Sequence, residues 1–158
     1  MTIEVCIDSV QSAINAQEAG AARVELCDNL FEGGTTPSAG TIALARQQIG
    51  IGLQVIIRPR GGDFLYSDLE MEIMKHDIRT AKKLGADGVV IGILTAEGRV
   101  DRERCQELID LARPMNVTFH RAFDMTRDPL EALEDIISLG CERLLTSGQQ
   151  KTAIEGQG

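Results

Sequence analysis

The sequence predicts an α/β protein in which parallel strands alternate with helices, and two patterns support this prediction. Apolar segments with the length and composition of buried strands occur at 2–7, 22–27, 52–57, 88–93, 116–120 and 142–146. A sequence pattern recurs at Gly20, Gly85 and Gly140. In each case the end of a predicted helix is followed by the glycine, by two small or polar residues and then by a predicted strand. Each glycine fits the left-handed backbone position just past a helix end. Strands and helices that alternate in this way form parallel βαβ units with right-handed crossovers.

Helices are expected between the strands, at 9–19, 37–49, 68–84, 101–112 and 129–139. Thr36 before Pro37 places a capping hydroxyl ahead of a proline at the first helical position. Ser67 and Asp128 each stand three residues before a glutamate, which is the spacing of a capping box. The third helix carries one apolar stripe, formed by Met71, Met74, Ile78 and Ala81.

Polar residues inside the strands favour a barrel over a doubly wound sheet. Three strands carry polar side chains at alternate positions, namely Glu4 and Cys6, Glu25 and Cys27, and Thr118 and His120. Period-two alternation turns both members of each pair to one face of the sheet. A sheet covered by helices on both faces would tolerate such a face poorly, whereas the upper interior of a barrel accommodates it. The expected fold is therefore a TIM-type (β/α)8 barrel.

The length implies that this barrel is incomplete. A full barrel takes about 250 residues, whereas the chain has 158 residues and no linker or low-complexity tract. We therefore expect a single domain, 1–158, of about six βα units, with strands seven and eight absent. The first and sixth strands would then have unpaired edges, which invite association. This predicts a homo-oligomer.

Composition and charge narrow the classes of function. The net charge of −8 argues against a nucleic-acid partner, which would require a basic face. No apolar run approaches the roughly 20 residues that a membrane span needs, and the N-terminus lacks the pattern of a signal peptide. The four cysteines are far apart along the chain. This spacing suits reduced thiols in a cytoplasmic protein.

Cys6 and Cys27 predict a metal site. Adjacent strands lie about 4.8 Å apart, so two thiolates on the same face of neighbouring strands come within reach of one ion. Thiolates with no imidazole nearby suit Cu(I) better than harder ions, which prefer oxygen ligands. In the alternative interpretation, both cysteines are small buried hydrophobic residues.

Arg58 and Arg60 predict an anion site where the third strand ends. They lie in a turn with two glycines, Gly61 and Gly62, which allows the backbone to approach a ligand closely. Ligands of parallel α/β proteins bind at this end of the strands, and arginine holds carboxylate or phosphate in bidentate fashion. Alternatively, the arginines form internal ion pairs that fasten the turn. Ser147, after the sixth strand, is a further anion-binding candidate.

His120 predicts acid–base chemistry or metal ligation at the end of the fifth strand. Glu25 and Asp124 are the other candidate catalytic residues, since both belong to the same predicted rim. Alternatively, His120 is an interior histidine that hydrogen-bonds Asp124 or Glu25. So many polar groups at one rim also fit an uncharacterised barrel enzyme that acts on a small anionic metabolite, a phosphate or a carboxylate.

Several segments together resemble the CutC family. The matching segments are VC at 5–6, VELC at 24–27, EGGTTPS at 32–38, IRPRGGDFLYSD at 57–68, VTFHRAFD at 117–124 and LTSGQ at 145–149. The resemblance implies a TIM-barrel fold and a cytoplasmic protein of copper homeostasis. It also implies Cu(I) binding by two cysteines, which fall on Cys6 and Cys27. Family members are about 100 residues longer and close the barrel with two more strands.

Overall fold

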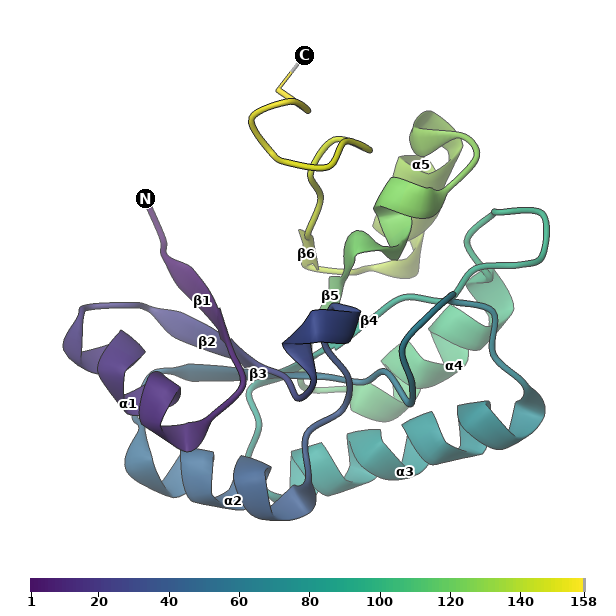
Figure 1. Cartoon of the computed structure of the whole chain (residues 1–158). Helices are drawn as coiled ribbons and strands as arrows, with labels where there is room; N and C mark the ends of the chain where they lie inside the picture. The colour runs from purple at the N-terminus through teal and green to yellow at the C-terminus, as the bar shows by residue number, and fades with distance from the viewer. Residues whose placement is uncertain (158) are drawn as a thin grey trace.

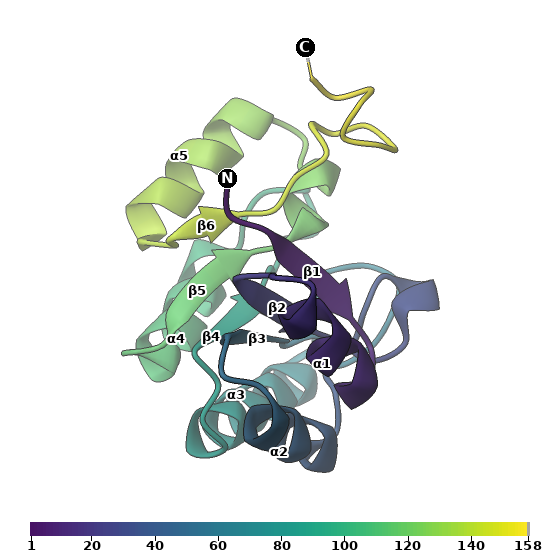
Figure 2. The same ribbon diagram turned by 90° about the vertical axis from the view of Figure 1, so that its left-hand side faces the viewer.

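A six-stranded parallel sheet curls into part of a barrel in the structure, a computed structural model that describes residues 1–157 (Figure 1). The strands pair in chain order, and each neighbouring pair is parallel. They are β1 (Glu4–Ile7), β2 (Arg23–Leu26), β3 (Gly52–Ile56), β4 (Gly88–Ile91), β5 (Asn116–Phe119) and β6 (Arg143–Leu144). The strand arrows in Figure 2 follow this curve from β1 to β6. The predicted TIM-type barrel of about six βα units is confirmed.

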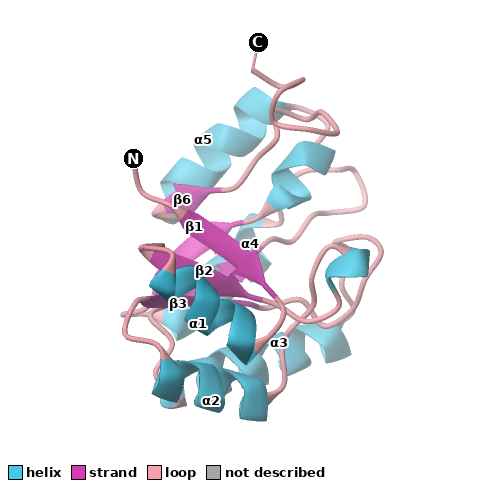
Figure 3. Cartoon of the chain, turned by 60° about the vertical axis from the view of Figure 1, so that its left-hand side comes forward, coloured by secondary structure: helices cyan, strands magenta, loops and turns pink. Residues whose placement is uncertain are grey.

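Five α-helices connect the strands and cover the outer face of the sheet (Figure 3). They are α1 (Val10–Glu18), α2 (Ala39–Gln48), α3 (Asp68–Lys83), α4 (Arg102–Ala112) and α5 (Pro129–Leu139). Two short 3₁₀ helices, η1 (Leu30–Glu32) and η2 (Arg121–Met125), follow β2 and β5. No helix within residues 1–157 is long and apolar enough to cross a membrane.

The predicted helix ends are largely confirmed. Gly20, Gly85 and Gly140 all have positive φ angles, of 88°, 88° and 80°. Ser67 forms a complete capping box with Glu70 at the start of α3. The buried residues of α3 are those of the predicted stripe, so this face of the helix packs on the sheet.

The predicted start of the second helix was wrong. The helix begins at Ala39 rather than at residue 37, and its N-cap is Ser38, whose hydroxyl accepts from the Thr41 N–H. Thr36 does not cap the helix; its hydroxyl instead accepts a hydrogen bond from the Arg58 N–H at 2.8 Å. The Thr36 N–H in turn donates to the Arg58 carbonyl. This loop is thus held to the end of β3 before the helix begins.

The alternate polar positions of the strands point into the barrel, as predicted. At the lower level, Arg143 donates to Gln54 Oε1 at 3.0 Å and to Thr118 Oγ1 at 3.1 Å. A small apolar cluster, formed by Cys27, Ile56 and Val90, lies apart from the main core between sheet and helices. Arg58 lies two residues after Ile56, the last residue of β3, and His120 lies two residues after Thr118 of β5. Both therefore continue the inward-facing positions at the carboxyl ends of their strands.

Candidate functional site

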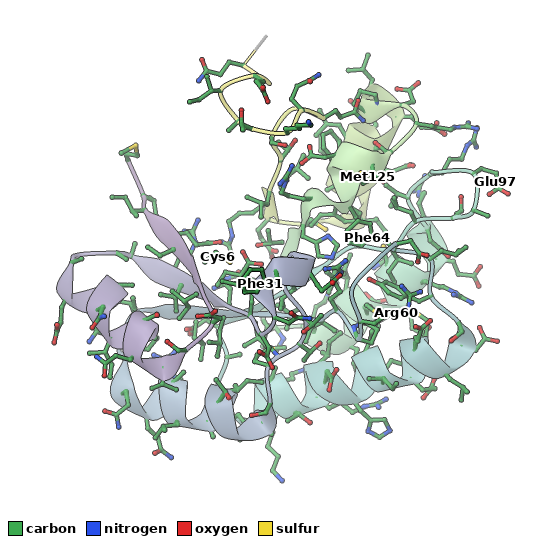
Figure 4. All side chains as sticks on the ribbon, viewed as in Figure 1. Cys6, Phe31, Arg60, Phe64, Glu97 and Met125 are labelled. Carbon is green, nitrogen blue, oxygen red and sulfur yellow. The ribbon has the colours of Figure 1, made fainter. Side chains whose placement is uncertain are left out.

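A cavity of about 500 Å³ opens at the carboxyl ends of the strands. Strands, 3₁₀ helices and the loop after β3 all contribute to its lining, which comprises Cys6, Glu25, Leu30, Glu32, Gly33, Ile56, Arg58, Phe64, His120, Arg121, Asp124, Met125 and Leu145. Figure 4 shows Cys6, Phe64 and Met125 on this side of the chain, together with Phe31 of η1. Ligands of parallel barrels bind at this end of the strands.

Cys6 and Cys27 lie side by side, with 3.6 Å between their sulfur atoms. Cys6 is paired in register with Glu25, and the Cys27 N–H donates to the Ile7 carbonyl, so the parallel ladder sets this approach. Cys6 is exposed, whereas Cys27 is buried. The hydrogen bond between the thiols lowers the pKa of Cys6 and raises that of Cys27, whose burial raises it further. Cys6 therefore ionises first.

Glu25 completes a cluster of three potential metal ligands. Its carboxylate and the sulfurs of Cys6 and Cys27 all lie within 4.8 Å of one another. The Glu25 side chain is only 5% exposed. Burial, reinforced by the charge of Glu4, raises the pKa of Glu25 to about 7. The cluster thus joins two soft sulfur donors to one oxygen donor.

Arg58 is buried at the cavity wall and fastens two loops through backbone carbonyls. Its Nη1 donates to the carbonyls of Glu32 at 2.5 Å and Gly34 at 2.9 Å, and its Nη2 donates to that of Gly62 at 2.8 Å. No carboxylate within residues 1–157 forms an ion pair with this guanidinium. The Phe64 ring lies 4.9 Å from Arg58 Cζ.

Arg60 does not join Arg58 in the cavity lining. Its guanidinium pairs with Asp63 at 3.0 Å and with Glu70 of α3 at 2.5 Å, and it lies over the Tyr66 ring. Figure 4 shows Arg60 beside α3. For this residue the structure matches the alternative interpretation, in which ion pairs fasten the turn.

His120 is fully enclosed at the end of β5, with only 4% of the residue exposed. Its Nδ1 accepts a hydrogen bond from the Ala122 N–H at 3.1 Å, whereas Nε2 has no partner within residues 1–157. Burial, reinforced by the charge of Arg58, lowers the pKa of His120 to about 3. The imidazole is therefore neutral near pH 7, and neither of its nitrogens bonds to Asp124 or Glu25.

Asp124 and Ser147 organise the loop after β6. Burial works against ionisation of Asp124, but hydrogen bonds from Thr146, Arg121 and backbone N–H groups outweigh it and lower the pKa to about 2. Ser147 is buried, donates to Asp124 and accepts from Arg121 Nη2 at 2.6 Å. Asp124 and Arg121 line the cavity, whereas Ser147 lies behind them.

Several lining residues were not predicted. Glu32 and Leu30 belong to η1, which follows Asn29 in a left-handed conformation with φ of 48°. This turn has no periodic pattern that would predict its position. Phe64 directly follows the arginine-rich turn in the sequence, but nothing in the turn indicates that its ring covers Arg58 and His120. The remaining cysteines, Cys105 and Cys141, are not among the lining residues.

Comparisons with known proteins identify the family. The sequence profile of the CutC family matches residues 1–158. A mouse protein named "Copper homeostasis protein cutC homolog" is 58% identical over 154 residues, which cover 98% of this chain and 57% of the relative. A family protein CutC from Chromobacterium violaceum is 60% identical over 154 residues, 98% of this chain and 62% of the relative. The chain thus spans less than two thirds of the length of these relatives.

The fold agrees with a crystal structure from the same family. The CutC structure from Streptococcus agalactiae superimposes with a TM-score of 0.93 at 39% sequence identity. The match covers 99% of this chain and 78% of that one. The sequence segments, the fold and the relatives all agree, and the chain belongs to the CutC family.

Proposed function

We propose that this chain takes part in copper homeostasis by binding Cu(I) between the thiolates of Cys6 and Cys27. The observation that carries the proposal is the 3.6 Å separation of the two sulfurs on neighbouring strands. Two relatives that are 58% identical to this chain over 154 aligned residues are each named "Copper homeostasis protein cutC homolog". Copper is the bound cargo in this proposal, and no reaction is assigned to the chain.

The geometry of the thiols fits one shared ion. Metal–thiolate bonds of about 2.3 Å allow two sulfurs on the same ion to lie up to about 4.6 Å apart, so the 3.6 Å separation is within reach. Soft thiolate ligands select Cu(I) over hard cations. The single carboxylate of Glu25 is too small an oxygen set for calcium, which takes 6–8 oxygen ligands.

The surroundings of the thiols support access from one side only. Cys6 is exposed on the cavity wall, whereas Cys27 packs with Ile56 and Val90 inside the barrel. The backbone of Gly34 approaches closely, so that a methyl group there would lie 3.2 Å from the Cys27 sulfur. An ion would therefore enter from the cavity and meet Cys6 first.

Anaerobic Cu(I) titration against a chromophoric chelator tests the proposal. We expect one ion per chain in the wild type. Loss of a direct ligand in Cys6→Ser or Cys27→Ser should weaken binding by more than the roughly 10–100-fold that loss of an outer-shell partner costs.

Cys105→Ser and Cys141→Ser are the matched controls, because they remove the same chemical group outside the cavity lining. They should keep wild-type affinity. Unchanged affinity in both Cys6→Ser and Cys27→Ser would refute the proposal. Tighter binding of Zn²⁺ than of Cu(I) at pH 7 would instead assign the cluster to zinc.

A further inference from the structure

A second part of the cavity wall, formed by other residues than the thiols, includes His120, whose Nε2 has no hydrogen-bond partner within residues 1–157. Because the Ala122 N–H donates to Nδ1 of His120, that nitrogen is unprotonated and the ring proton resides on Nε2. This Nε2–H has no acceptor within residues 1–157, although the residue is 96% enclosed. A buried polar group left without a partner costs about 1–3 kcal/mol. Such a group in a native fold requires an explanation.

The same wall carries a positive charge without a counter-ion. Arg58 is 4% exposed, and its three hydrogen bonds all go to neutral carbonyls. Its Nε also has no hydrogen-bond partner within residues 1–157, and neither does the hydroxyl of its neighbour Tyr66. Buried charges are ordinarily paired. Five N–H groups belong to a guanidinium, so this residue has donors left over as well as an unneutralised charge.

Phe64 links these two residues on one surface. Its ring centroid lies 5.0 Å from that of His120 and 4.9 Å from Arg58 Cζ. The three side chains all line the same cavity. Among residues 1–157, the other cation that lines the cavity is Arg121, which Asp124 neutralises at 2.8 Å. The unpaired charge of Arg58 and the unpaired donor of His120 therefore belong to residues that both pack against Phe64.

The rest of the lining is suited to an organic body. Leu30, Ile56, Met125 and Leu145 contribute apolar surface around the same space. A volume of about 500 Å³ is within the usual range of small-molecule sites, roughly 300–1,000 Å³. Glu25 also lines the cavity beside the thiols and disfavours an anion there, whereas the Glu32 carboxylate lies against Gly61 of the turn that carries Arg58. A ligand would place its charged end at the Arg58–His120 wall and its apolar part along the leucines.

We propose that this cavity binds a small organic oxyanion, a carboxylate or a phosphate monoester with a short apolar body. One oxygen of the ligand accepts the Nε2–H of His120, and its charge neutralises Arg58. The site shares this cavity with the proposed copper site but uses other side chains and needs no metal. The two proposals can therefore fail independently.

Calorimetric titration with three probes of matched apolar bodies tests this site: butyrate, butyl phosphate and butanamide. The protein is freed of metal and carries Cys6→Ser and Cys27→Ser, so that thiol chemistry does not contribute. At least one anionic probe should bind about ten-fold or more tightly than the neutral amide, as expected for a hydrogen-bonded charge. The better anion then identifies the head group. Equal binding of all three probes would overturn the proposal.

Matched substitutions locate the site. Arg58→Met should abolish the preference for the anion, whereas Arg60→Met, with the same change of charge in the same turn, should leave it intact. Equal losses in both variants would place binding on the outer turn and overturn the proposal. His120→Phe should reduce the preference by about ten-fold, with circular dichroism as the check on folding.

A measurement on unsubstituted residues covers the case in which Arg58→Met does not fold. The chain has two histidines, and His76 is exposed on α3, so His76→Asn leaves one imidazole signal. The ¹⁵N resonance of His120 Nε2 should shift on titration with the tighter anion and not with butanamide. A resonance that stays in place at saturating anion would contradict the assignment.

Discussion

Glu25 makes the stability of the chain depend on pH in a direction opposite to that of most carboxylates. Its pKa rises from an ordinary 4.5 to about 7 on folding, mainly because of burial and then because of Glu4. The folded chain therefore binds a proton that the unfolded chain releases between these values. The resulting stability is fully present below pH 4.5 and is lost as the pH rises through about 7. At 1.36 kcal/mol per pKa unit, the change is on the order of 3 kcal/mol.

Urea unfolding of wild type and Glu25→Gln, followed from pH 4 to pH 8, measures this effect. Metal is chelated and the thiols are kept reduced, so that only proton binding differs. The free energy of unfolding of the wild type should fall by about 3 kcal/mol relative to Glu25→Gln across this range. Groups away from Glu25 titrate alike in both proteins, so the difference reports Glu25 together with the Cys6 and Cys27 thiols, whose pKa values its charge raises. If the free energy of unfolding depended on pH in the same way in both proteins, the claim that Glu25 takes up a proton on folding would be refuted.

Two further predictions concern packing and helix capping. Gly92→Ala would place a methyl group 2.5 Å from His120 Nδ1. It should therefore destabilise the fold by about 1–3 kcal/mol in urea unfolding. Gly40→Ala is the control and should not destabilise the fold, because its added methyl group meets only the Ser38 hydroxyl at 3.7 Å. A fully stable Gly92→Ala would mean that the ring is not held against β4. Ser67→Ala removes the cap of α3 and should cost about 1 kcal/mol by the same assay; a loss no larger than that of an exposed substitution in mid-helix would argue against the capping box.

The fold could be predicted from the sequence because its signals are local and consistent. Glycines such as Gly85 end helices through a backbone preference that no distant contact alters. Period-two alternation predicted that Cys6 and Cys27 face the same interior, and parallel pairing in chain order then brought the sulfurs together. The error at the second helix arose from a distant contact, since the Thr36 hydroxyl accepts from the Arg58 N–H just after β3 instead of capping the helix.

The roles of the arginines could not be separated from the sequence. Arg58 and Arg60 are two residues apart, yet one is buried against carbonyls and the other forms ion pairs with Asp63 and Glu70. Which residue enters the cavity depends on how the turn packs on α3, and spacing carries no information about that. Self-association, cytoplasmic location and the anion-binding role of Ser147 remain predictions from the sequence.

X-ray absorption at the copper edge tests the central claim most directly. The protein is the double variant Cys105→Ser with Cys141→Ser, loaded with one Cu(I) per chain, so that Cys6 and Cys27 are its only thiols. Two sulfur neighbours per copper are predicted, falling to one when Cys6→Ser is added. A copper shell of nitrogen and oxygen alone, or a spectrum that Cys6→Ser does not change, would contradict a copper site shared by the two strands.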